Sequence, residues 1–533
     1  QSIADLAGLS VAELAAFLDK LKRSAREQAI ADDLLKEIGG RLQFLERVGL
    51  AYLSLDRAAP TLSGGETQRL RLAAQLGSNL RGVCYVLDEP TIGLHPRDNR
   101  LLLDALSELG QGRNTLVVVE HDEETIRRAD HVLDLGPGAG TRGGHVVAAG
   151  TMAEILRSPD SVTGRCLREP MQHPATPRRP VIRRGANATP MLELAGVTLH
   201  NLRKVDVELP LGRLIALTGV SGSGKSTLAL DVLRPELERA VARPAKSKKL
   251  QFCTGLAGSD NIERVLEVDQ TPIGKTPRSC PATYVGFWDA IRRVFAGTTE
   301  AGIRGYTASR FSFNTSGGRC PACEGQGLRT VEMNFLPDVK VLCDVCKGQR
   351  FDAETLSIRW RERSIGDVLA MNVDDAVEFF RSHASICHAL ELLQEVGLGY
   401  LTLGQQSPTL SGGEAQRIKL VTELARIRPI PGAPAGKGSF YILDEPTVGL
   451  HMADVERLIT VLHRLADAGN TVLVVEHNLD VIAEADWIID LGPEAGPDGG
   501  RIVAAGSPAA VTGHKTSRTG AELARHREHR HDA

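Results

Sequence analysis

The stretch GVSGSGKST, residues 219–227, decides the fold of this chain. It fits the phosphate-loop pattern G-x-x-x-x-G-K-S, follows the apolar run LIALTGV and precedes a segment with helical spacing. Backbone amides of such a loop cradle phosphate oxygens, while Lys225 reaches the β and γ phosphates and Ser226 coordinates Mg²⁺. The candidate nucleotide-binding residues of the loop are Gly219, Ser221, Gly222, Ser223, Gly224, Lys225, Ser226 and Thr227.

Several other segments occur twice, in the same order. TLSGGETQRL at 61–70 returns as TLSGGEAQRI at 409–418, and YVLDEPTIGLH at 85–95 returns as YILDEPTVGLH at 441–451. A repeat unit this long indicates two related domains rather than a solenoid. The phosphate loop, however, is present only in the second copy, so the question is where its counterpart lies.

The repeated apolar runs end in residues suited to phosphate chemistry. CYVLDEP and FYILDEP end in acids, while NTLVVVEH and NTVLVVEH end in His121 and His477. These runs predict buried parallel strands whose carboxyl ends carry a ligand site. In the second copy, Asp444 is predicted to hold the Mg²⁺ shell, Glu445 to polarise the attacking water, and His477 to contact the γ-phosphate. Each LSGGE segment places a serine and two glycines at the start of a helix. The N-terminus of such a helix is a second place where phosphate can bind.

Taken in order, these motifs resemble those of the ABC-type ATPases, and Gln270 in EVDQTPIG resembles that family's Q-loop. The resemblance implies two units docked head to tail, with each nucleotide between the phosphate loop of one and the LSGGE of the other. One complete site would then join the loop, Asp444, Glu445 and His477 of the second copy to Ser63, Gly64 and Gly65 of the first. The other site would contain Ser411, Gly412, Gly413, Asp88, Glu89 and His121, and we expect its phosphate loop upstream of Gln1.

Four cysteines lie between the phosphate loop and the second LSGGE. Cys320, Cys323, Cys343 and Cys346 follow the pattern C-x2-C-x19-C-x2-C. Two tight pairs at this spacing are typical of a tetrahedral structural Zn²⁺ site. The sequence therefore predicts a zinc module inserted in the second domain.

The surroundings of this module, GYTASRFSFNTSGGRCPACEGQGLRTVEMNFLPDVKVLCDVCKGQRF at 305–351, resemble the UvrA family, the damage sensors of the bacterial excinuclease ABC system. TPRSCPATYVGFWDAIRRVFA and HNLDVIAEADWIIDLGP match as well, so that the resemblance covers nearly the whole chain. That family also has a first phosphate loop, a domain that binds the UvrB helicase, another zinc module and an inserted domain, none of which is found in these 533 residues.

The resemblance implies an ATPase of nucleotide excision repair that is not itself the nuclease. It would bind damaged double-stranded DNA as a homodimer, sense distortion rather than base sequence, and load UvrB, with ATP, Mg²⁺ and Zn²⁺ as cofactors. Basic residues around the zinc module are candidates for phosphate contacts, which position a protein without reading bases. They are Arg304, Arg310, Arg319, Arg329, Lys340, Lys347 and Arg350.

Bulk properties agree with a globular protein but do not define a partner. The formal net charge is −3, so DNA binding must come from local basic patches. No apolar run approaches the roughly 20 residues of a membrane span, which together with the paired cysteines favours a cytoplasmic protein.

We therefore predict an α/β fold with tandem ABC-type P-loop ATPase domains, the first incomplete, with helical signature subdomains and an inserted zinc module. The predicted boundaries are 1–167 for the first domain, 168–190 for a linker, 191–513 for the second domain with an insertion at about 271–425, and 514–533 for a polar tail. Three alternatives remain open: a transporter ATPase, which the zinc insertion disfavours, a UvrA-like paralogue in drug self-resistance, and a fragment acting only as a zinc-containing DNA-binding module.

Overall fold

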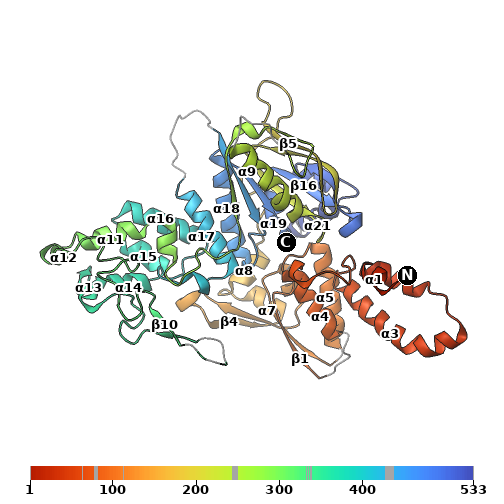
Figure 1. Ribbon diagram of the computed structural model, residues 1–533, viewed down its shortest axis with the longest axis horizontal. Helices are drawn as coiled ribbons and strands as arrows, with labels where there is room; N and C mark the ends of the chain where they lie inside the picture. Colours follow the sequence, from red (N-terminus) through yellow and green to blue (C-terminus); the bar gives the residue numbers. More distant parts are fainter. Residues whose placement is uncertain are drawn as a thin grey trace. The chain divides into compact units, whose positions relative to one another are not determined.

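A computed structural model describes residues 2–62, 64–76, 82–111, 113–242, 250–331, 333, 335, 339–426 and 437–531 of the chain. The chain forms two compact units (Figure 1). The first unit comprises Gln1–Asp134, Ala148–Glu267 and Pro434–Ala533, and the second comprises Leu135–Val147 and Val268–Ala433.

A six-stranded sheet forms the centre of the first unit, with the strand order β17-β16-β7-β15-β14-β9. The pairs β14–β15, β15–β7 and β7–β16 are parallel, and β17 pairs antiparallel with β16 at the edge. Their bounds are β7 (Leu214–Gly219), β9 (Ile262–Val268), β14 (Gly438–Asp444), β15 (Thr471–Val475), β16 (Trp487–Gly492) and β17 (Arg501–Gly506).

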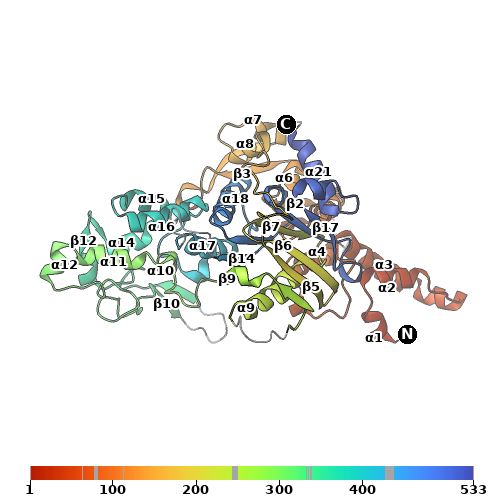
Figure 2. The ribbon, with the colours of Figure 1, turned by 90° about the horizontal axis from the view of Figure 1, so that it is seen from above.

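The apolar runs of the second copy form strands because the sheet is covered on both faces. Every residue of β7 and β15 is buried, as expected for parallel strands packed between layers. Helix α18 (Met452–Asp467) packs on β15 and β7. Figure 2 shows α18 near β7. An antiparallel sheet of β5 (Met191–Leu199), β6 (Leu202–Pro210) and β8 (Gly255–Ala257) adds its apolar face to the same core.

The first copy repeats only part of this architecture. Strands β1 (Cys84–Asp88) and β2 (Thr115–Val119) pair in parallel with Asp88 opposite Val119, just as Asp444 lies opposite Val475 in the second copy. Exposure differs sharply, because Val86 is 71% exposed whereas its counterpart Ile442 is 0% exposed. Among the described residues before β5, none form strands that correspond to β5, β6 and β7, which cover and extend the second sheet.

The remaining elements of the first unit are mostly helices. They are α1 (Ile3–Ala7), α2 (Val11–Asp19), α3 (Ala25–Arg47), η1 (Ala59–Thr61), α4 (Gly64–Leu76), α5 (Pro96–Gln111), α6 (Glu123–Arg128), α7 (Met152–Arg157), α8 (Val162–Arg168), η3 (Thr227–Leu233), α9 (Arg234–Ala242), η4 (Ser259–Asn261), α19 (Leu479–Glu484), η6 (Gly496–Asp498), α20 (Pro508–Thr512) and α21 (Arg518–His531). Two paired strands, β3 (Val132–Gly136) and β4 (His145–Gly150), carry the chain across the boundary between the units.

The second unit is mainly helical, with two small hairpins. Strands β10 (Leu328–Val331) and β11 (Val339–Leu342) pair antiparallel, with Thr330 opposite Lys340, and β12 (Arg359–Trp360) pairs with β13 (Arg363–Ser364). The other elements are η2 (Gly140–Arg142), α10 (Pro281–Val285), α11 (Trp288–Ala296), α12 (Thr299–Ile303), α13 (Ala353–Ser357), α14 (Ile365–Ala370), α15 (Val373–Phe379), α16 (Ala384–Glu395), η5 (Ser407–Thr409) and α17 (Gly412–Leu424). Among the described residues of both units, no helix is long and apolar enough to cross a membrane.

Candidate nucleotide site and metal module

The phosphate loop follows β7 and turns on glycines that no other residue can replace. Gly219, Gly222 and Gly224 have φ of 139°, 76° and 104°. A Cβ at Gly219 would lie 2.0 Å from the carbonyl oxygen of Leu491, so the close approach also requires glycine. Thr227 begins the helical segment η3, as the sequence predicts.

Lys225 folds back over its own loop. Its Nζ donates to the carbonyl oxygens of Gly219 at 3.1 Å and Val220 at 3.0 Å. Burial lowers the pKa of Lys225 to about 8, although the nearby carboxylates of Glu445 and Asp98 oppose this shift. A buried cation above a ring of amides is a suitable receptor for a polyphosphate.

The predicted acids and histidine meet beside this loop. Strand β14 ends at Asp444, and Glu445 follows with φ of 43°, an uncommon conformation for a residue other than glycine. Burial, followed by the charges of Asp444 and Glu476, raises the pKa of Glu445 to about 7. His477 Nε2 lies 4.0 Å from Glu445 Oε1, and burial holds the pKa of His477 well below its usual value.

Two buried polar atoms fit a ligand at this position. Ser223 Oγ in the loop and His477 Nδ1 have no hydrogen-bond partner among the described residues. A triphosphate with Mg²⁺ fits the set of donors: backbone amides and Lys225 for phosphate oxygens, and Ser226 and Asp444 for the metal.

The first copy packs directly on this loop. Ser221 Oγ donates to the carbonyl oxygen of Gly93 at 3.2 Å, and the Ser221 backbone amide donates to Asp98 Oδ2 at 3.4 Å. A Cβ at Gly93 would lie 3.1 Å from Glu445 Oε2. Residues of the first copy therefore form part of the wall around the second copy's acids.

The signature helix of the first copy is linked to the loop through one tyrosine. Gly64 and Gly65 begin α4, whereas Ser63 lies outside the described residues. Tyr52 OH donates to Glu66 Oε1 at 2.5 Å, and a Cβ at Gly222 would lie 2.9 Å from the Tyr52 ring.

The second signature segment lies in the other unit. Ser411 caps α17 by accepting from the Glu414 amide at 3.2 Å, and Gly412 and Gly413 form the first turn. Gln270 lies against this turn, since a Cβ at Gly412 would be 3.1 Å from Gln270 Oε1.

The first copy repeats the arrangement of acids and histidine that follows β14 and β15 in the second copy. Asp88 ends β1, Glu89 has the same φ of 43°, and His121 Nε2 lies 3.9 Å from Glu89 Oε1.

Two further histidines, which the sequence motifs did not single out, make hydrogen bonds between the copies. His95 Nε2 lies 3.2 Å from Thr519 Oγ1, and the equivalent His451 Nε2 lies 3.1 Å from Thr163 Oγ1. Thr163 donates in turn to Asp134 in β3, and Thr519 donates to Asp490 in β16. Both histidines end the repeated segment LDEPTxGLH, so the repeat itself was the signal that could have found them.

The four paired cysteines converge in the second unit. Their Sγ atoms lie within 4.8 Å of one another, with Cys320 4.0 Å from Cys343 and Cys323 3.6 Å from Cys346. The Gly327 amide donates to Cys323 Sγ at 3.2 Å. Four buried sulfurs at these distances form a cluster suited to a tetrahedral Zn²⁺.

Most of the predicted basic patch is already paired with acids. Arg304 pairs with Glu300, Arg310 with Asp352 and Glu354, Arg319 with Glu324, and Arg329 with Asp344. Lys340 and Lys347 are exposed, and neither has an ion-pair partner within the part of the chain that the structure describes.

Arg350 is a correction to that patch. It is only 4% exposed, and it donates to the carbonyl oxygen of Gly404 at 2.6 Å while lying 5.0 Å from the centre of the Phe313 ring. Burial lowers its pKa. Arg350 therefore packs inside the unit, where it cannot contact DNA phosphates.

Comparison with known proteins identifies the relatives of the chain. UvrABC system protein A of Thermus thermophilus is 55% identical over 529 residues, which are 98% of this chain and 54% of that protein. The Aquifex aeolicus protein of the same name is 51% identical over 98% of this chain and 55% of its own length. The crystal structure of UvrA2 from Deinococcus radiodurans matches with a TM-score of 0.85 and 47% identity, covering 98% of this chain and 63% of that one. No protein-family model matches.

The parallel sheet, the phosphate loop and the duplicated motifs define a tandem of ABC-type ATPase domains, the first incomplete, with a four-cysteine module in the second unit. Within that class, nearly the whole chain is similar to UvrABC system protein A. It spans about half the length of the curated relatives it matches.

Proposed function

We propose that this chain binds and hydrolyses ATP as part of a DNA damage-recognition subunit of nucleotide excision repair. The observation that carries the proposal is the meeting of Lys225, Glu445 and His477 in a buried setting, closed by Gly93 of the first copy. Burying charged groups costs free energy, so a purely structural role would not require a buried lysine beside buried acids. Such groups are concentrated at functional sites.

Each residue has a separate part in that activity. Lys225 and the loop amides bind the β and γ phosphates, while Ser226 and Asp444 hold Mg²⁺, which when bound neutralises charge on the phosphates. Glu445 orients and polarises the attacking water, and His477 contacts the γ-phosphate. Ser63, Gly64 and Gly65 would close the site from the first copy. Ser411, Gly412 and Gly413 would serve the second site, together with Asp88, Glu89, His121 and a second phosphate loop. Gln270 would act as the Q-loop.

The second unit is the proposed contact to DNA. Arg329 and Lys340 lie on the strands of the β10–β11 hairpin, and Lys347 follows it in the sequence. Phe335, between the two strands in the sequence, is 99% exposed. Cations suit phosphates, and an exposed aromatic ring suits contact with unstacked bases at a distorted site. The four cysteines would bind structural Zn²⁺ and hold the hairpin in place.

The partners follow from the family. We propose a homodimer that binds damaged duplex DNA and loads UvrB, without nuclease chemistry of its own. A role in drug self-resistance is the second candidate, because a UvrA-like paralogue with that role would have the same motifs. A transporter ATPase has less support, because the inserted cysteine module suits a nucleic-acid-binding protein.

The test is ATP hydrolysis by the chain with matched damaged and intact duplexes. We expect both duplexes to change the rate of ATP hydrolysis, the damaged duplex at a lower concentration than the intact one. Lys225→Ala should abolish hydrolysis but keep duplex binding. Duplex binding without any ATP hydrolysis would instead support a DNA-binding module alone. Hydrolysis that is indifferent to both duplexes would contradict the role in damage recognition.

A further inference from the structure

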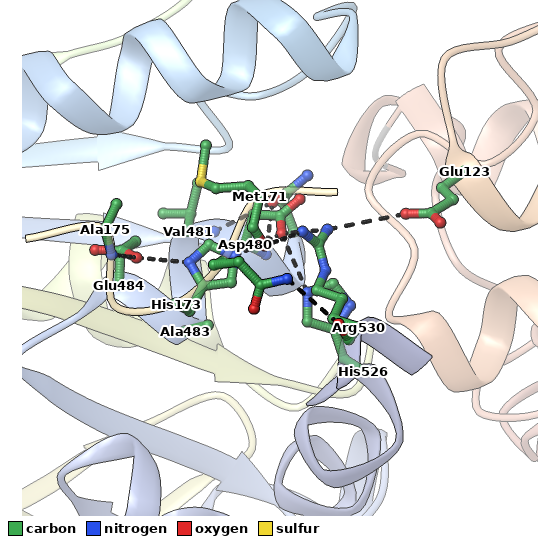
Figure 3. Close-up of polar contacts among 12 residues, drawn as sticks. Glu123, Met171, His173, Ala175, Asp480, Val481, Ala483, Glu484, His526 and Arg530 are labelled. Carbon is green, nitrogen blue, oxygen red and sulfur yellow. Dashed lines mark hydrogen bonds and ion pairs between the residues drawn. The ribbon is translucent and has the colours of Figure 1, made fainter. Parts of the chain in front are cut away.

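Three side chains from separate parts of the chain meet in one polar cluster (Figure 3). His173 lies in the segment between the copies, Asp480 in α19 and His526 in α21. His173 Nε2 is 2.8 Å and His526 Nε2 is 3.1 Å from the same oxygen, Asp480 Oδ1. The side chains are 4%, 17% and 13% exposed, so the cluster is largely enclosed. Two imidazole nitrogens and a carboxylate oxygen are the ligand types that bind Zn²⁺, Co²⁺ and Ni²⁺.

A second carboxylate fixes the orientation of His173. Its Nδ1 lies 2.6 Å from Glu484 Oε1, while Glu484 also accepts from His463 Nε2 at 3.0 Å and from the Ala175 amide at 2.7 Å. The ring therefore presents Nε2 to Asp480. Metal-binding histidines are commonly held this way, with the far ring nitrogen donating to a carboxylate.

One cation already lies at the cluster. Arg530 in α21 places its guanidinium nitrogen 2.6 Å from Asp480 Oδ1 and 3.9 Å from Glu123, and it also donates to the carbonyl oxygen of Met171. A metal ion and this guanidinium would compete for the same carboxylate. Arg530 therefore opposes ion binding at Asp480 Oδ1, and removing its charge tests the inference.

The duplication shows that the cluster is not a by-product of the fold. At the offset that relates Asp88 to Asp444, the first copy has Glu124 in place of Asp480 and Arg128 in place of Glu484. Glu124 and Arg128 form an ordinary ion pair at 2.9 Å. The position of His526 is taken by Pro170, so this histidine has no counterpart in the first copy.

The cluster opens to a cavity of about 750 Å³. Asp480, His526 and Arg530 line it, and so do Glu445 and His477 of the nucleotide site. An ion can therefore reach the cluster, and water from the cavity can complete its coordination. Three protein ligands and one open position is a common arrangement for Zn²⁺.

We propose that His173, Asp480 and His526 form a binding site for a divalent transition metal ion of the Zn²⁺ class, with Glu484 orienting His173. The ion ties the segment between the copies to α19 and α21. Because Asp480 lies three residues after His477, the tie also restrains the strand end that carries the γ-phosphate histidine. This site is separate from the four-cysteine cluster and does not depend on DNA binding.

The experiment is a Co²⁺ titration of the metal-free chain, followed by absorption spectroscopy and metal analysis. Thiolate ligands give Co²⁺ intense charge-transfer bands, so the four-cysteine site and a site without sulfur are distinguishable. We expect one ion with these bands and a second without them. His173→Gln and His526→Gln should each remove only the second ion, and Cys323→Ser only the thiolate bands.

Arg530→Gln separates a metal site from a polar network, because it keeps all three ligands. It should bind the second ion roughly tenfold more tightly, since a charge-assisted hydrogen bond to Asp480 no longer competes. ATP binding by each variant reports whether it is folded. A single ion with thiolate bands in both the parent and Arg530→Gln would overturn the proposal, as would a second ion retained by both histidine variants.

Discussion

Ser221 of the phosphate loop donates its hydroxyl hydrogen to the backbone carbonyl of Gly93, with 3.2 Å between the two oxygens. The two residues belong to different copies of the repeat, and Gly93 also lies against the carboxylate of Glu445. The nucleotide site of the second copy is therefore shaped by a segment of the first.

The first prediction concerns Gly93 itself. Its φ is 66°, and a Cβ there would lie 3.1 Å from Glu445 Oε2. Gly93→Ala should displace the Glu445 carboxylate and lower ATP turnover about tenfold or more, because small misplacements of a catalytic group are costly. Affinity for ATP should change little.

Gly449→Ala is the matched control for Gly93→Ala. Gly449 has a φ of 67°, but a Cβ there would meet Glu89 only at 3.7 Å, an ordinary contact. It carries the same backbone strain without the clash at Glu445. Equal effects of the two variants on turnover would show that strain, and not the position of Glu445, sets the rate.

The second prediction concerns His95, which must stay neutral to join the copies. Its Nδ1 accepts from the Arg97 amide at 3.2 Å, and its Nε2 contacts Thr519. Burial, then Lys225, lowers the pKa of His95 from 6.5 to about 3. As the pH falls, His95 is therefore protonated in the unfolded chain before it is protonated in the folded chain. The free energy of unfolding decreases as the pH falls below about 6.5.

The test is urea unfolding of the parent and His95→Gln at about pH 7.5 and pH 5. One proton over this interval corresponds to about 2 kcal/mol of unfolding free energy. Between pH 7.5 and pH 5, the unfolding free energy of the parent should fall by about 2 kcal/mol more than that of His95→Gln. His145 is exposed, and His145→Gln should behave like the parent. Identical losses in all three proteins would rule out this role for His95.

The third prediction concerns the four cysteines. Cys323→Ser should release zinc and loosen the hairpin at 324–342, because a structural site supplies folding energy to its own small domain. ATP binding should survive, since Lys225 and its partners lie in the other unit. Discrimination between damaged and intact duplex should fall more than total affinity at low salt. Zinc retained at full stoichiometry would reject the ligand assignment.

The fourth prediction concerns the exposed lysine of the hairpin. Lys340→Ala should weaken binding to damaged and intact duplexes alike and reduce the slope of log K against log salt by about 0.9, the contribution of one phosphate contact. Lys36→Ala is the control, because Lys36 is an exposed lysine of α3 that pairs with Asp32. A salt slope that Lys340→Ala leaves unchanged would exclude a phosphate contact.

Local patterns predicted much of the fold and of the candidate site. The phosphate loop, the strand ends at Asp444 and His477, and the cysteine pairs each depend on short segments with strong geometric requirements, so the sequence alone placed them. The tandem fold followed from the repeat. The predicted domain boundaries and the roles of the site residues stay predictions.

Contacts between distant segments could not be predicted in the same way. Arg350 looked like a phosphate contact in a basic stretch, but its partner is the carbonyl of Gly404, and burial there depends on tertiary packing. The stretch 514–533 reads as a polar tail, yet it contains α21, whose Leu523 is 0% exposed. The cluster of His173 with Asp480 joins residues 307 positions apart and leaves no local signal.

The most direct test of the account is to measure ATP affinity and ATP turnover on one preparation each of Glu445→Gln, Lys225→Ala and Glu89→Gln, the first-copy equivalent of Glu445→Gln. We predict that Glu445→Gln keeps ATP bound but lowers turnover about 10²–10⁴-fold, the usual effect of losing a general base. Lys225→Ala should lose most ATP binding, and Glu89→Gln should keep both properties in this chain. Equal loss of ATP affinity in Glu445→Gln and Lys225→Ala, or loss of turnover only in Glu89→Gln, would contradict the proposed site.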